Sequence, residues 1–99
     1  MKDNFREVEH SQTTGLQIRL VKETHVFPWS QFLFAEGSED EIRLAFSTHD
    51  VVITGGRLDV LLPDVAAQRV KLLKEPLRSD TFAAKSELTI TGISVKKVE

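Results

Sequence analysis

The chain has 99 residues, of which 40% are hydrophobic and 28% are charged, a balance typical of one globular domain and not of a disordered chain or a coiled coil. Lys and Arg total 13 against 15 Asp and Glu, so the net charge of −2 provides no basic excess for general binding of nucleic acid. Cysteine is absent, which excludes disulfides, thiolate metal sites and cysteine nucleophiles.

The first predicted strand follows a polar N-terminal segment. Residues 1–14 have apolar side chains only at Phe5 and Val8, and we expect them to be either a disordered, frayed terminus or a loosely docked strand. From Leu16 apolar and polar residues alternate, as in a half-buried strand. We therefore expect a single domain over 15–99.

Two hairpins are predicted in the next part of the chain. Pro28 cannot donate to a strand ladder, so 25–29 should be an edge strand, or the end of one, with a kink near Ser30. A polar turn at 37–40 then predicts a hairpin over 32–47. Residues 48–50 lead into a β-branched strand that ends at two glycines, which makes a second hairpin and a four-stranded meander.

A change of period predicts one amphipathic helix, at about 58–74. Pro63 fits its first turn or its start, and Pro76 ends it. A loop is expected over 77–85, and one or two closing strands over 88–95 with a bulge or turn at Gly92. The predicted buried face of the helix consists of residues spaced at three and four: Leu58, Leu61, Leu62, Val65, Ala66, Val70 and Leu73.

The predicted fold class is α+β, with an antiparallel meander sheet of about five or six strands and this one helix. A half-barrel capped by the helix, in the manner of pleckstrin-homology-like rolls, is one arrangement that the order allows. That analogy concerns the fold alone and carries no function.

Three groups of residues resemble functional motifs but favour structural roles. Ser47, His49 and Asp50 have the residue types of a hydrolase triad, yet they lie together in a predicted turn. Gly55 and Gly56 precede the predicted helix without a phosphate-binding pattern, so they indicate a sharp corner. The acidic turn lacks the ligand spacing of a calcium loop; its members are Glu36, Glu39, Asp40 and Glu41, around Gly37.

No catalytic, cofactor-binding or metal-binding residue is predicted. His10, His25 and His49 are the only imidazoles, and none has a second ligand at metal-site spacing, although His25, His49 and a carboxylate remain open as a site assembled in space. A cluster of aromatic residues favours a functional role, because in a meander the side chains of such a cluster cannot all face one core, and we expect some of them to form an exposed apolar patch. This candidate interaction surface consists of four aromatic residues: Phe27, Trp29, Phe32 and Phe34.

The stretch 51–70 resembles a pattern in small uncharacterised bacterial proteins. The pattern joins an ITGxxL strand-to-helix corner, here 53–58, to a helix that ends in a QRV-like triplet, here 68–70. The group has no assigned activity. The resemblance implies a bacterial origin, and acids near the start, with no stretch long enough to span a bilayer, lead us to expect a cytoplasmic protein.

Our first functional hypothesis is a non-enzymatic interaction module that self-associates, or binds another protein, through an edge strand near 26–29. The second is a small-ligand or enzyme domain with a pocket between helix and sheet, using His49 or His25 with Arg57. Nucleic-acid binding is not expected; it would need a basic face built from Arg69, Lys71, Lys74, Arg78 and Lys85.

Overall fold

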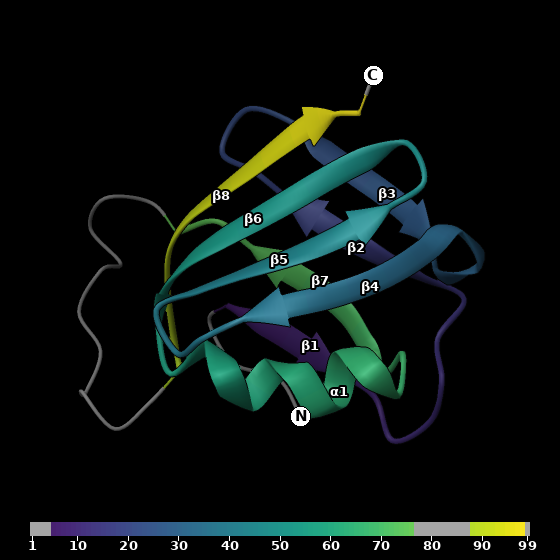
Figure 1. The fold of residues 1–99 in the computed structure, drawn as a ribbon, viewed down its shortest axis with the longest axis horizontal. Helices are drawn as coiled ribbons and strands as arrows, with labels where there is room; N and C mark the ends of the chain where they lie inside the picture. Colours follow the sequence, from purple (N-terminus) through teal and green to yellow (C-terminus); the bar gives the residue numbers. More distant parts are fainter. Residues whose placement is uncertain (1–4, 77–87, 99) are drawn as a thin grey trace.

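Two four-stranded sheets lie face to face in the computed structural model, which describes residues 5–76 and 88–98, and a short helix lies at one end of them (Figure 1). In Figure 1 the strands of the front sheet run across those of the sheet behind. The sheet behind, called the first sheet here, has the order β1 (Arg6–Val8), β7 (Val70–Lys74), β2 (Gly15–Arg19) and β3 (Thr24–Pro28). The front sheet, called the second sheet, has the order β4 (Phe32–Gly37), β5 (Glu41–Phe46), β6 (His49–Gly56) and β8 (Thr89–Lys97).

Alternating side chains define the strands that the sequence predicted. In β2 the side chains of Leu16 and Ile18 are fully buried, while Arg19 is exposed. In β5 Ile42 and Leu44 point into the same core. Because successive side chains of a strand alternate between its two faces, each sheet buries one face against the other. The strands near 16 and 25 and the two hairpins between 32 and 56 are confirmed.

The predicted four-stranded meander is wrong in one respect. The chain leaves the first sheet at the end of β3, makes a 3₁₀ turn over Trp29–Gln31, and enters the second sheet at β4. Pro28 and Phe32 flank this turn in extended conformations. Only β4, β5 and β6 therefore form a meander, and the kink expected near Ser30 is the crossing point between the two sheets.

The prediction of one long helix at about 58–74 is also wrong. A 3₁₀ turn covers Leu58–Leu61 and the α-helix α1 covers only Leu62–Ala66, after which Val70–Lys74 forms β7. Of the predicted helical face, Leu62 is half-buried and Ala66 is exposed. Its other five members are buried, from three different elements: Leu58, Leu61, Val65, Val70 and Leu73.

A Schellman motif ends α1. Gln68 has a left-handed backbone with φ of 56°, and its N–H donates to the carbonyl of Val65 at 2.9 Å. The N–H of Arg69 donates to the carbonyl of Asp64 at 2.9 Å, and the Arg69 Nη2 contacts the Asp64 carboxylate at 2.6 Å. These bonds satisfy the last helical carbonyls and turn the chain toward β7.

Two substitutions at Gln68 distinguish this turn from a continuous helix. We expect the variant Gln68→Gly to be more stable than Gln68→Val by about 1–2 kcal/mol, because glycine accepts a left-handed φ and a β-branched residue does not. In an uninterrupted helix the order would reverse, since glycine is the poorer helix former. Urea unfolding of both variants measures the difference, and a more stable valine variant would contradict the turn.

The two ends of the described chain are strands. The expected docked first strand is β1, which pairs with β7 and has Phe5 and Val8 buried beside it. The 88–95 segment forms the single long strand β8, and the pairing of β6 with β8 shifts register close to Gly92, as the predicted bulge requires. The loop expected at 77–85 lies outside the described residues.

In fold class the chain is mostly β with one short helix, and α+β only in this broad sense. Its core lies between the two sheets and receives side chains from the 3₁₀ turn over 58–61 and from α1. In residues 5–76 and 88–98 no helix is long and apolar enough to cross a membrane.

Candidate interaction surface

The four aromatic residues of the candidate surface separate into buried and exposed members. Phe27 and Trp29 are buried, and Phe32 is half-buried. Phe34 alone is exposed, at 44%. Phe27 and Trp29 therefore belong to the core in this structure, and the accessible part of the predicted surface is Phe34 with the rim of Phe32.

The aromatic rings of Phe27, Trp29, Phe32 and Phe46 form one cluster between the two sheets. Phe46 lies at its centre, with ring centroids 4.7 Å from Phe27, 5.6 Å from Phe32 and 6.0 Å from Trp29. The indole N–H of Trp29 donates to the hydroxyl of Thr13 at 2.9 Å, which satisfies the polar atom of the buried ring. The crowding of aromatic residues in the sequence is thus mainly a packing feature.

The most exposed large apolar side chain of the described residues is Val26, at 69%, and sequence reasoning named it only as part of an edge strand. Val26 lies at the middle of β3, whose only neighbour among the described strands is β2. The prediction of an edge strand near 26–29 is confirmed.

The hydrogen bonds at both ends of the β2–β3 hairpin show which backbone groups of β3 face its free side. Trp29 N–H donates to Thr14 at 3.1 Å, and Leu20 N–H donates to Glu23 at 2.8 Å. In an antiparallel ladder the bonded pairs recur at every second residue, so His25 and Phe27 bond to β2. The N–H and carbonyl groups of Thr24 and Val26, and the carbonyl of Pro28, therefore point away from the sheet.

This alternation also explains Pro28. The group that proline lacks would have pointed to the free side of β3, so the ladder with β2 loses no hydrogen bond. A proline in this strand is compatible only with an edge position. Beyond Pro28 the edge ends, because the chain turns away into the second sheet.

The other three sheet edges carry features that oppose pairing with another chain. β1 has only three residues and a register shift within its pairing to β7. β4 has a register shift between Phe32 and Phe34, and α1 contacts it. β8 ends in exposed Lys96 and Lys97. Short length, bulges, helix cover, lysines and prolines are the usual protections of edge strands. Of these β3 has only Pro28, which lies at its last position and leaves the outward groups of Thr24 and Val26 free.

His25 and His49 approach one another between the sheets. Their ring centroids are 6.2 Å apart and both rings pack on Phe27, at 5.9 and 5.3 Å. The Nε2 atom of His25 lies 3.6 Å from the Glu23 carboxylate. Across the described ranges, no group of three or more His, Asp or Glu side chains could hold a metal ion.

Arg57 does not join the two histidines. His49 begins β6 and Arg57 follows its last residue, so about 25 Å of strand separates them. Arg57 is paired with Asp59 at 3.8 Å. The pocket expected between helix and sheet, with a histidine and Arg57 together, is not formed by these residues.

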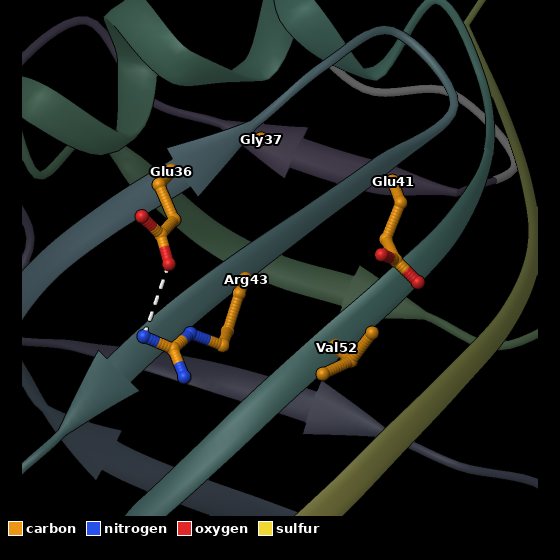
Figure 2. Close-up of a pocket in the computed structure, with 5 residues that line it drawn as sticks. All are labelled: Glu36, Gly37, Glu41, Arg43 and Val52. Carbon is orange, nitrogen blue, oxygen red and sulfur yellow. Dashed lines mark ion pairs between the residues drawn. The ribbon is translucent and has the colours of Figure 1, made fainter.

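A shallow hollow on the outer face of the second sheet surrounds Arg43 (Figure 2). The Arg43 guanidinium contacts Glu36 at 3.0 Å and Asp50 at 3.7 Å, and it lies 5.2 Å from the Phe34 ring centroid. Glu41 and Val52 form the other side of the hollow in Figure 2. A second hollow, on the outer face of the first sheet, is lined by seven residues that include Val26: Glu9, Thr13, Thr14, Gly15, Gln17, Val26 and Lys71.

The remaining candidate motifs have structural partners. Ser47 donates to Gln31 at 2.7 Å, His49 bonds Thr48 at 2.9 Å, and Asp50 pairs with Arg43, so the three are not aligned as a triad. In the acidic turn Ser38 N–H donates to the Glu41 carbonyl at 2.8 Å, which closes the predicted hairpin.

Two of the basic residues that nucleic-acid binding would need lie beside carboxylates. Arg69 pairs with Asp64 and Lys71 lies 3.9 Å from Glu9, while β7, which contains Lys71 and Lys74, is an inner strand of the first sheet. Arg78 and Lys85 lie outside the described residues.

Comparison with known proteins finds no matching family model, no matching curated protein and no matching solved structure.

Proposed function

We propose that this chain is a small non-enzymatic interaction module that self-associates through the free edge of β3. The observation that supports it is the accessible edge: a strand without Asp, Glu, Lys or Arg, with the backbone donors and acceptors of Thr24 and Val26 directed outward and Val26 exposed at its centre. Pairing of such an edge with a second strand satisfies those backbone groups and covers apolar surface at the same time.

A half-barrel capped by the helix, in the manner of a pleckstrin-homology-like roll, is the finer arrangement that the order of the predicted elements allows. The division of the strands into two separate four-stranded sheets and the five-residue length of α1 do not favour this arrangement. The self-association proposal does not depend on such a roll, because β3 has one neighbour only among the strands of residues 5–76 and 88–98.

The test is the effect of a charge on the β3 edge. We expect the wild-type chain to be a dimer in light scattering at high micromolar concentration, and the variant Val26→Lys to be a monomer. Two lysines brought together at a strand edge repel one another, and lysine on an edge opposes pairing in natural sheets. A cross-strand pair contributes about 0.2–1 kcal/mol, and the repulsion of the two lysines adds to its loss, so we expect the dimer to weaken about tenfold, which corresponds to about 1.4 kcal/mol.

Val21→Lys is the matched control. Val21 is 56% exposed and lies in the turn between β2 and β3, away from the pairing edge. This variant should remain a dimer. A monomeric wild-type chain at high micromolar concentration would overturn the proposal, and so would equal weakening by the two lysines.

A further inference from the structure

The backbone groups on the free side of β3 restrict how a second copy can pair with it. Thr24 and Val26 each present an N–H and a carbonyl, and Pro28 presents a carbonyl alone, by the alternation set by the Trp29 and Leu20 hydrogen bonds. A partner strand must supply donors and acceptors opposite these groups. A second β3 that runs antiparallel, with its Val26 opposite the first, provides both.

We infer that two copies pair antiparallel about a twofold axis at Val26, so that their first sheets join into one continuous eight-stranded sheet. The inference rests on the proposed self-association and specifies its geometry. In this register each Val26 N–H donates to the Val26 carbonyl of the other copy, and each Thr24 N–H donates to a Pro28 carbonyl. The missing N–H of Pro28 costs one bond at each end of the ladder and none at its centre.

The side chains of β3 are self-complementary in the same register. The strand Thr24–Pro28 contains no Asp, Glu, Lys or Arg, so no like-charged pair of these residues is brought together within it. Val26 meets Val26 on the outer face, and His25 lies opposite Phe27 on the inner face. Pairs of β-branched residues and pairs of aromatic rings are among the stabilising cross-strand pairs of antiparallel sheets.

An axis at Phe27 satisfies fewer of these groups within the strand, whereas an axis at His25 satisfies as many but leaves the Pro28 carbonyl opposite the β2–β3 turn. A shift of the axis to His25 or Phe27 leaves an end of β3 opposite the β2–β3 turn or the 3₁₀ turn over Trp29–Gln31. Only the axis at Val26 pairs all five residues of the strand with the same five residues of the other copy. This is the isologous contact that a symmetric dimer requires.

Single cysteines test the register, because the chain has no cysteine of its own. Directly opposed residues of a bonded pair have Cα atoms about 5.5 Å apart, which lies within the range of a disulfide. In the variant Val26→Cys we expect rapid formation of a covalent dimer in a glutathione redox buffer, read on a non-reducing gel. The variant Thr24→Cys has its cysteine on the same face of the strand. In the proposed dimer the two Cys residues at position 24, one from each copy, lie four positions apart along the paired strands, about 13 Å, which is beyond the reach of a disulfide.

The expected result is an initial rate of disulfide formation at least tenfold higher for Val26→Cys than for Thr24→Cys. An equimolar mixture of Thr24→Cys and Pro28→Cys should give the mixed disulfide, since those positions are opposed. Equal rates for Val26→Cys and Thr24→Cys in a chain that light scattering shows to be a dimer would overturn the register alone. A monomeric wild-type chain would overturn the proposed function itself.

Discussion

The variant Phe46→Ala is expected to lose about 3–5 kcal/mol of the free energy of unfolding, the cost of removing a large aromatic side chain from a packed core. Phe46 is 2% exposed and contacts three other rings, from β3, the 3₁₀ turn and β4. The total free energy of unfolding of a domain of this size is about 5–15 kcal/mol. Much of the stability of the fold would therefore be lost at one position.

Trp29 provides the measurement, because it is the only tryptophan of the chain and is buried beside Phe46. Its fluorescence during urea unfolding reports the loss of the core. Phe34→Ala is the control, since Phe34 is 44% exposed and its removal should cost less than about 1 kcal/mol. Equal losses in the two phenylalanine variants would contradict the placement of the core.

The variant Gly55→Ala is expected to lose about 1–3 kcal/mol or more, from a backbone collision. A Cβ atom at Gly55 would lie on the Thr89 carbonyl, and it would also lie 3.1 Å from the Ile90 Cα. Both atoms belong to the backbone of β8, so the collision can be relieved only if β6 and β8 separate. Thermal unfolding followed by circular dichroism measures the loss.

The neighbouring glycine is the control for this prediction. A Cβ atom at Gly56 has nothing within 4 Å, and the backbone of Gly56 is not left-handed. Gly56→Ala should be neutral or should stabilise the chain by about 0.4–1 kcal/mol, because alanine restricts the unfolded state. If Gly55→Ala unfolds at the temperature of Gly56→Ala, the close approach of β6 and β8 is wrong.

The strands β2 to β6 and β8 could be predicted from the sequence, whereas the division between α1 and β7 could not. Leu58, Leu61 and Val65 have helical spacing, and Val70 and Leu73 continue it by coincidence, because a strand buried in a sheet can also have apolar residues three apart. The break depends on the left-handed Gln68, and glutamine carries no signal for that conformation. Glycine at this position would have revealed the end of the helix.

The candidate surface was predicted only in part. The edge position of β3 followed from Pro28, whose missing N–H is a local property of the sequence. The burial of Phe27 and Trp29 depends on Phe46 and on the crossing of two sheets, which are contacts between distant residues. The exposure of Val26 could have been inferred from alternation, since it lies between His25 and Phe27, the residues that face the core side.

The parallel pairing of β2 with β7 makes folding of the first sheet depend on distant segments. Residues 17–19 pair with residues 72–74, whereas β4, β5 and β6 are joined by short turns. Local pairs form sooner because they close shorter loops, so we expect the meander of the second sheet to fold before β7 docks. Until β7 docks, the side of β2 opposite β3 remains unpaired. A β7 segment from another molecule can fill that place, so refolding at high concentration carries a risk of strand exchange and aggregation that dilution removes.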